Sequence, residues 1–316
     1  MTFDEKIVSC VLKFQDIQKP DYASSEIDYY ADFIELVVLF AGEDGITQGD
    51  IQDRFFGEKD YSNAGERDED EAFLKSIFLR IEERITLFSN DYPFSYLENE
   101  ILTLKLNLSI NNKLYLSLLL SSKLNIFKDL KSELTTDFES ISYSVLKNFL
   151  PTHSIVKEFG KNTSYIGNAI DKIKQLANDL DLAVNEYEIS QVGSRNNQER
   201  GLDIIGWIPF GDNCGNKVIY LCQCACGKQY ESKQHDTRRF ENYLQFYKTN
   251  PQHTLFIPYS LINFRAKKFY HSDCIEKDYL IFERKRILEY YQADIFDTLQ
   301  SKQIVEKCVV YNISEI

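Results

Sequence analysis

Two short apolar runs separated by a tight turn constrain the fold of this chain most strongly. Residues 202–210 read LDIIGWIPF and residues 216–226 read NKVIYLCQCAC, with GDNCG between them. Runs of this length, rich in Ile, Val and aromatic residues and joined by a turn that contains Gly and Asn, are typical of an antiparallel hairpin. The sequence therefore predicts a hairpin that other strands must extend into a sheet.

The second run carries cysteines at alternate positions. Because side chains alternate across a strand, one face carries Cys222, Cys224 and Cys226, and the other carries Leu221, Gln223 and Ala225. The cysteines could bind zinc together with Cys274 or His271, but a chain that turns around zinc usually leaves at least two residues between its ligands. We therefore expect the cysteines to pack as small apolar side chains. Gln223 is the better functional candidate, because a buried amide needs polar partners.

The first half of the chain reads as mainly helical. Apolar residues follow a helical period at 26–42 and 71–89, and the polar, acidic stretch 58–71 between them is expected to be an exposed loop. Residues 101–109 alternate as a short strand does, and helices then lead to Pro151.

The second half mixes helices and strands. A helix is predicted at about 165–182 and another at 236–248, followed by an apolar run at 253–262 and a segment, 278–292, that begins apolar and becomes helical. Helices that alternate with strands around a hairpin predict an α+β protein whose second domain has a mixed sheet.

Charge divides the chain at the same place. Residues 1–150 hold 15 Lys and Arg against 28 Asp and Glu, which leaves 21 of each sign for residues 151–316 from chain totals of 36 and 49. Phosphate contacts depend on Lys and Arg, so the acidic half is expected to be a regulatory or partner-binding domain. The balanced half is the candidate for nucleic-acid binding.

The chain has no segment typical of a membrane protein or a secretory signal. Its longest apolar stretch, residues 114–120, is too short to span a bilayer, and its first residues are acidic where a signal would be basic. Seven cysteines without the spacing of a disulfide framework suit a reducing compartment. We expect a soluble, cytoplasmic protein with no membrane partner.

Two polar residues in the hairpin predict a metal site. Asp203 opens the first strand after a polar turn, and Gln223 lies in the second strand. Carboxylate and amide oxygens on neighbouring strands suit a hard cation such as Mg²⁺. The alternative is that Asp203 only caps the hairpin. Trp207 is in phase with Asp203 and is expected in the core.

These residues resemble a known family. The segment GLDIIGWIPF…KVIYLCQCACGK resembles the PD-(D/E)XK restriction-endonuclease-like superfamily over about residues 160–262, and more narrowly the nuclease domains of bacterial anti-phage or restriction proteins. The resemblance implies a DNA nuclease in which Asp203 and Gln223 bind Mg²⁺ or Mn²⁺. It also implies a lysine two positions after the second ligand, where this chain has Ala225.

Other residues are therefore needed to complete the site that the resemblance implies. Lys228 and Lys233 are the candidates for the catalytic lysine. An acid from the preceding segment often adds a metal ligand, and Glu199 is preferred here, with Asp171 and Asp179 as alternatives.

The mechanism implied is metal-assisted hydrolysis of a phosphodiester. Arg238, Arg239 and Lys248 are expected to hold the nucleic-acid backbone, and His235 either contacts substrate or is a solvated residue at a helix start. Because Ala225 replaces the motif lysine, the rival prediction is a subunit that keeps the fold and binds nucleic acid or a partner without catalysis.

Overall fold

The structure, a computed structural model of the 316-residue chain, describes residues 2–97, 100–160, 163–193 and 201–311. Glu199, the preferred acid from the sequence, lies outside these residues. Within them, no helix combines the length and the apolar character that crossing a membrane would require.

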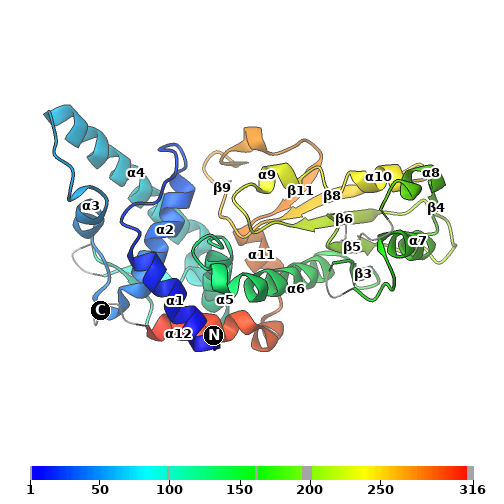
Figure 1. Ribbon diagram of the computed structural model, residues 1–316, viewed down its shortest axis with the longest axis horizontal. Coiled ribbons are helices and arrows are strands. Elements are labelled where there is room, and N and C mark those ends of the chain that lie inside the picture. Colours follow the sequence, from blue (N-terminus) through cyan, green and yellow to red (C-terminus); the bar gives the residue numbers. More distant parts are fainter. Residues whose placement is uncertain (1, 98–99, 161–162, 194–200, 312–316) are drawn as a thin grey trace. The chain divides into compact units, whose positions relative to one another are not determined.

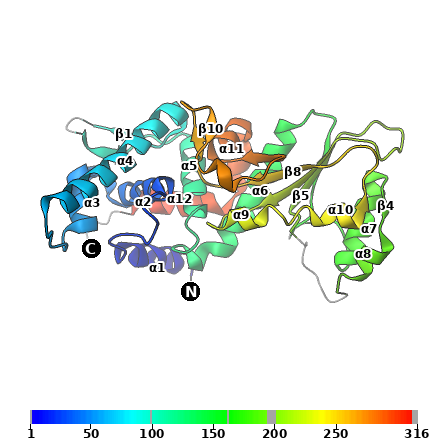
Figure 2. The ribbon, with the colours of Figure 1, turned by 90° about the horizontal axis from the view of Figure 1, so that it is seen from above.

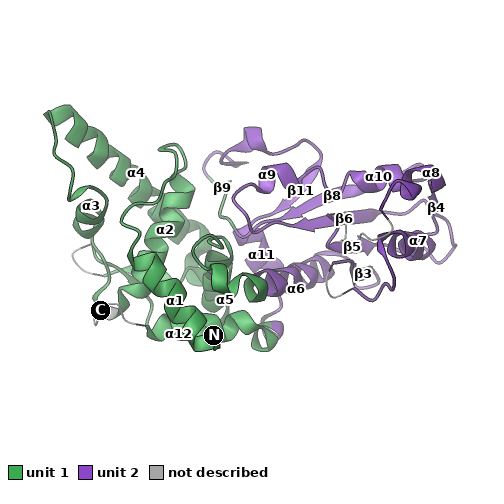
Figure 3. Cartoon of the chain, viewed as in Figure 1, with its two compact units in different colours: residues 1–134, 259–264, 296–316 green, residues 135–258, 265–295 purple. Residues whose placement is uncertain are grey.

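The chain forms two compact units (Figure 3). Unit 1 comprises residues 1–134, 259–264 and 296–316, and unit 2 comprises residues 135–258 and 265–295. These bounds differ from the expected division at residue 150. The helix before Pro151 belongs mostly with the sheet, because its residue Leu146, and Leu150 just after it, pack against Gly206. The last helix of the chain returns to unit 1.

Unit 1 is mainly helical, as the sequence predicts. Its elements are α1 (Phe3–Gln15), α2 (Ile27–Phe40), α3 (Gln48–Phe56), α4 (Ala64–Phe88), β1 (Phe94–Tyr96), β2 (Leu102–Leu104), α5 (Ile110–Ser121) and α12 (Gln300–Val310). The loop predicted at 58–71 is shorter than expected. The side chain of Asn63 accepts a hydrogen bond from the Glu66 backbone N–H, and such a cap starts a helix, so the acidic residues form the first turns of α4.

A buried ionic network joins the helices of unit 1. The Arg84 guanidinium on α4 donates from Nη1 to Asp32 Oδ1 over 2.8 Å and to Glu35 Oε1 over 2.6 Å, both on α2. The Tyr92 and Tyr115 hydroxyls donate to the same Glu35 carboxylate. Burial alone would lower the pKa of Arg84, but Glu35 and Asp32 raise it well above its ordinary value. The guanidinium is therefore charged, and its charge is balanced within the core.

Unit 2 contains the predicted sheet. Its elements are α6 (Lys131–Phe149, which begins at the end of unit 1), β3 (Ile155–Glu158), α7 (Ala169–Leu180), β4 (Ala183–Val184), α8 (Glu186–Ser190), β5 (Ile204–Trp207), β6 (Ile219–Cys224), α9 (Tyr230–Lys233), α10 (Arg239–Tyr243), β7 (Leu244–Gln245), β8 (Gln252–Phe256), β10 (Lys268–Phe269), β11 (Tyr279–Phe282) and α11 (Arg284–Tyr290); β9 (Ile262–Asn263) falls in unit 1.

The large sheet has the strand order β11-β8-β6-β5-β3 (Figure 1). Strands β3, β5 and β6 are antiparallel, whereas β8 is parallel to β6 and β11 is parallel to β8. The expected hairpin is β5–β6, with Ile205 opposite Leu221 and Trp207 opposite Ile219. The α+β class and the mixed sheet are thus confirmed.

Two predicted helices differ in length. The helix expected at 165–182 begins only at Ala169, after the Asn168 cap, and Ile166 stays exposed. The long helix expected at 236–248 is wrong. The chain there forms the short helix α10 and then β7, because Leu244 and Gln245 pair with β4 and Leu244 is buried. Figure 2 shows α7, α8, β4 and α10 gathered at one end of unit 2.

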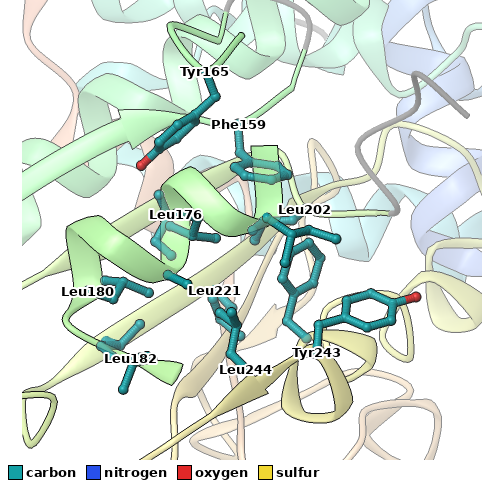
Figure 4. Packing of buried hydrophobic residues seen from close by; sticks show 14 of the residues in the cluster. Phe159, Tyr165, Leu176, Leu180, Leu182, Leu202, Leu221, Tyr243 and Leu244 are labelled. Atoms are coloured by element: carbon teal, nitrogen blue, oxygen red, sulfur yellow. The ribbon is translucent and has the colours of Figure 1, made fainter. Parts of the chain in front are cut away.

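Helices cover both faces of the hairpin. One face packs into an apolar cluster with α7 and α10 (Figure 4), to which the hairpin contributes Leu202, Ile205, Trp207, Ile219 and Leu221. Trp207 is therefore a core residue, as expected. The opposite face contacts α6 at Gly206, where a side chain would meet Leu146 and Leu150.

Candidate functional site

Asp203 and Gln223 meet at the end of the hairpin. The ladder that pairs Ile204 with Cys222 continues through a hydrogen bond from the Asp203 backbone N–H to the Cys222 carbonyl over 2.9 Å. This register places Asp203, just before β5, opposite Gln223 of β6. The predicted pair of polar side chains is therefore brought together by the hairpin.

The Asp203 carboxylate is held in a fixed orientation. Its Oδ2 accepts hydrogen bonds from Gln223 Nε2 over 2.7 Å and from the Cys224 backbone N–H over 2.6 Å. The Asp203 carbonyl accepts from the backbone N–H groups of Phe159 and Gly160.

Gln223 carries an unsatisfied acceptor. The residue is only 7% exposed, and its Oε1 has no hydrogen-bond partner among the described residues. A buried polar atom without a partner costs about 1–3 kcal/mol, so its presence next to a carboxylate needs an explanation. A bound cation would satisfy it.

Glu139 is the acid that the sequence did not predict. It lies on α6, and its Oε2 would be 3.2 Å from a Cβ placed on Gly160, while Asp203 Oδ1 would be 3.6 Å from the same point. The absence of a side chain at Gly160 therefore leaves a space flanked by two carboxylates. Burial raises the pKa of the Cys224 thiol well above its ordinary value, and Asp203 and Glu139 raise it further. No local pattern around Glu139 could have indicated this role.

The side chains of this region suit a hard divalent cation. Carboxylates such as those of Asp203 and Glu139, and an amide oxygen such as that of Gln223, are the ligand types that Mg²⁺ and Mn²⁺ accept. Among the described residues, no group of three or more His, Cys, Asp and Glu side chains is placed to hold a metal ion. The candidate site differs from such a group in having an amide as its third donor.

The alternative acids lie elsewhere. Asp171 accepts from the Asn168 backbone N–H and so caps α7. Asp179 Oδ2 accepts from Lys157 Nζ and from the Tyr165 hydroxyl, each over 2.6 Å. Both carboxylates thus have partners that help to hold α7 in place.

The two candidate lysines lie in the segment after β6. Lys228 is exposed in the turn that follows the strand. Lys233, at the end of α9, contacts Asp236 Oδ2 over 3.4 Å with its side chain about half exposed. Ala225 itself is buried. The strand position that the resemblance assigns to a lysine is therefore apolar, and Lys228 and Lys233 stay candidates from the segment after it.

The cysteine face packs as expected. Cys222 is fully buried, and burial raises the pKa of its thiol. The Cys224 thiol contacts Ser142 on α6. Cys274 lies next to Glu231, and burial raises its pKa to about 11. The burial of Cys222 and Cys226 agrees with the expectation that these side chains pack as small apolar groups.

The predicted backbone-binding residues spread over α10 and the following loop. Arg239 contacts Asp236 over 3.0 Å, and Lys248 is exposed after β7. Arg238 lies over the Tyr279 ring, with 5.3 Å from its guanidinium carbon to the ring centroid. His235 is exposed and lies 3.9 Å from Glu276, as a solvated residue would.

Comparison with known proteins adds no further constraint. No family model, no curated protein and no solved structure matches this chain. The function must therefore be argued from the site itself.

Proposed function

We propose that unit 2 is a metal-dependent nuclease domain that hydrolyses phosphodiester bonds in DNA. The observation that carries this proposal is the buried Oε1 of Gln223, which has no hydrogen-bond partner among the described residues although the same amide contacts Asp203 through Nε2. Asp203 Oδ1 and Glu139 Oε2 in turn flank the position that a Cβ on Gly160 would take, and a cation bound between the two carboxylates and the reoriented amide would give these groups a simple physical account.

Each residue has a separate role in this proposal. Asp203, Glu139 and Gln223 supply oxygens, and the Cys224 backbone N–H keeps Asp203 oriented when the cation is absent. When bound, Mg²⁺ lowers the pKa of a water and offsets negative charge on the phosphate. Lys228 or Lys233 would add a positive charge near the attacked phosphate. Arg239 and Lys248, both accessible, would contact the DNA backbone.

The arrangement of strands supports the resemblance to restriction-endonuclease-like nucleases. Asp203 stands at the start of β5, Gln223 lies near the end of β6, and two short helices lead to β8, which runs parallel to β6. This is the order that the resemblance implies. A role as the effector of a bacterial defence system, with unit 1 binding a regulatory partner, is part of the same proposal.

A second candidate function rests on Ala225. The usual lysine position is a buried alanine, so unit 2 would keep the fold and bind nucleic acid or assemble with a partner without cleaving. The two functions differ in whether cation binding leads to hydrolysis.

The test is cleavage of supercoiled and linear DNA by the full chain with Mg²⁺ or Mn²⁺. We expect cleavage that EDTA abolishes and that Asp203→Asn and Glu139→Gln reduce by at least about a hundredfold, in line with the loss of a catalytic metal ligand. Asp212→Asn is the matched control, since Asp212 lies in the exposed hairpin turn, where its Oδ1 accepts from the Cys214 backbone N–H. Cleavage that survives Asp203→Asn contradicts the proposal, and cation binding without cleavage favours the non-catalytic function.

A further inference from the structure

A polar groove lies at the opposite end of the β11-β8-β6-β5-β3 sheet from Asp203 and Gln223. It has a volume of 530 Å³ and is lined by the first residues of β8, by Val218 and Tyr220, by Asp278 and by α10 through Arg238 and Glu241. This volume is in the range of small-molecule and nucleotide sites. The groove lies where β6, β8 and β11 begin, whereas Asp203 and Gln223 lie where β6 ends, so it is distinct from the candidate metal site.

A buried histidine forms the floor of the groove. His253 is 4% exposed; its Nε2 lies 2.6 Å from Glu241 Oε1 and its Nδ1 lies 2.9 Å from Thr237 Oγ1. A carboxylate only accepts, so Nε2 carries the proton and Nδ1 accepts from the Thr237 hydroxyl. Thr237 also lies 3.2 Å from the Tyr279 hydroxyl. This chain of hydrogen bonds fixes the Glu241 carboxylate at the mouth of the groove.

The second charged group at the mouth is fixed as well. The Arg238 guanidinium lies over the Tyr279 ring, and that ring stacks on His253 with 5.4 Å between centroids. Arg238 Nη1 lies 3.8 Å from Glu241 Oε1. A guanidinium and a carboxylate are thus held side by side, both partly exposed, by a buried polar network. Ordinary surface residues are not held in this way, and such support is typical of binding groups.

The charges of the groove favour a neutral group between Arg238 and Glu241. Glu241 and Asp278 outnumber Arg238, so a negatively charged group at that position would be repelled. A neutral, planar group is favoured if it presents an acceptor to the guanidinium and adjacent N–H donors to the carboxylate. Among nucleobases, guanine has this pattern: O6 accepts, and N1–H and N2–H₂ next to it donate.

We propose that this groove binds a guanine base, with Glu241 accepting from N1–H and N2–H₂ and Arg238 donating to O6. The carboxylate has lone pairs enough to keep its bond to His253 and accept these two. Adenine and cytosine present an amino donor where guanine presents O6, and thymine offers one donor instead of two. The groove should therefore prefer guanine to the other bases.

The guanine could belong to a free nucleotide or to an unpaired residue of a nucleic-acid strand, since splayed bases are bound along the same edge. The experiment separates these sources. Isothermal titration calorimetry of the full chain would compare GMP with AMP, and an oligodeoxyadenylate with one central guanine against the same strand without it. All titrations contain EDTA, so the result does not depend on cleavage.

We expect guanine to bind at least about tenfold more tightly than adenine, the discrimination of a good base contact. A preference with GMP identifies a nucleotide site, and a preference in the strand alone identifies a site for nucleic acid. Equal affinity for the two bases, or no binding of either probe, overturns the proposal without bearing on the nuclease site.

Variants test the two recognition residues. Glu241→Gln keeps an oxygen that accepts from His253, so the fold is retained. Its second oxygen becomes an NH₂ donor, which cannot accept from the guanine N–H groups, so guanine affinity should fall about tenfold. Arg238→Lys keeps the positive charge but loses the planar set of guanidinium N–H donors, so guanine affinity should fall by a similar factor. Glu289→Gln on α11 is the matched control and should bind as the wild type does. A guanine preference that persists in Glu241→Gln overturns the assignment.

Discussion

Gln223 donates a hydrogen bond to Asp203 across the β5–β6 hairpin, over 2.7 Å from Nε2 to Oδ2, while its own Oε1 is buried without a partner among the described residues. The amide nitrogen thus provides a hydrogen bond for the carboxylate, while the amide oxygen has none. If a cation bound beside both groups, the amide oxygen would turn towards the metal and the hydrogen bond from Nε2 would be given up. The pair is expected to respond to divalent cations in a way that ordinary strand residues do not.

Gln223→Glu should convert this pair into one that depends on metal. Without a cation, the hydrogen bond to Asp203 is lost and two carboxylates face each other, which should lower the free energy of unfolding by about 1–3 kcal/mol. With Mn²⁺, the extra negative charge should bind the ion more tightly, so the melting temperature should rise more than in the wild type. Thermal unfolding with and without Mn²⁺ measures both effects.

The matched control for that experiment is Gln175→Glu. Gln175 lies on α7 and its Nε2 donates to the Ile166 carbonyl, away from Asp203. Its variant should show the same Mn²⁺ response as the wild type. An equal Mn²⁺ response in Gln223→Glu and Gln175→Glu would mean that Gln223 does not face a cation.

Gly160→Ala should block cation binding while leaving the fold intact. The added Cβ would lie 3.2 Å from Glu139 Oε2 and 3.6 Å from Asp203 Oδ1, so it fills the space between the carboxylates. The stability without metal should change by less than about 1 kcal/mol, and the rise in melting temperature with Mn²⁺ should disappear. Gly193→Ala is the control, since a Cβ there meets nothing within 4 Å. A full Mn²⁺ response in Gly160→Ala would place the cation elsewhere.

The hairpin and its two faces could be predicted from the sequence because they depend on local rules. The turn fixes which strands pair, and the alternation of side chains then fixes the faces. Trp207 in the core, the buried Cys222 and the meeting of Asp203 with Gln223 all follow from that register. The mixed sheet was also predictable from local patterns, because segments with a helical spacing of apolar residues alternate with strand-like segments along the second half of the chain.

The other residues around the sites could not be predicted, because tertiary packing brings them together. Glu139 reaches the space beside Asp203 from α6, and its own segment shows only a helical period. The network of His253 with Glu241 joins β8 to α10, and α10 was expected as part of a longer helix. That helix failed because pairing of Leu244 with Val184 in a small sheet overrides local helix propensity.

Arg84→Leu should strongly destabilise unit 1. Removing the guanidinium leaves the carboxylates of Asp32 and Glu35 buried with less positive charge to balance them. Breaking a buried ion pair from one side costs about 3–5 kcal/mol. Urea unfolding followed by circular dichroism measures the change. Arg67→Leu is the control, because Arg67 is exposed and pairs with the exposed Glu71 one turn away; it should change stability by less than about 1 kcal/mol. Similar losses in both variants would contradict a structural role for the network.

His253 should make the protein less stable in mild acid. Burial lowers the pKa of His253 from its ordinary value of 6.5. The Glu241 carboxylate opposes this shift, and the positive charge of Arg238 adds to it. Thr237 and Tyr279, the other neighbours of the ring, are neutral here. When folding lowers the pKa of a base, the buried neutral base is compatible with the full free energy of unfolding at pH values above its unfolded pKa. That stability is lost as the pH falls below about 6.5 towards the folded pKa. Each unit of depression corresponds to about 1.4 kcal/mol. Melting temperatures between pH 8 and 5 should therefore fall more steeply for the wild type than for His253→Gln, whose amide can still bond to Thr237 and Glu241 without titrating. Parallel profiles for the two proteins would show that His253 does not titrate differently in the folded and unfolded states.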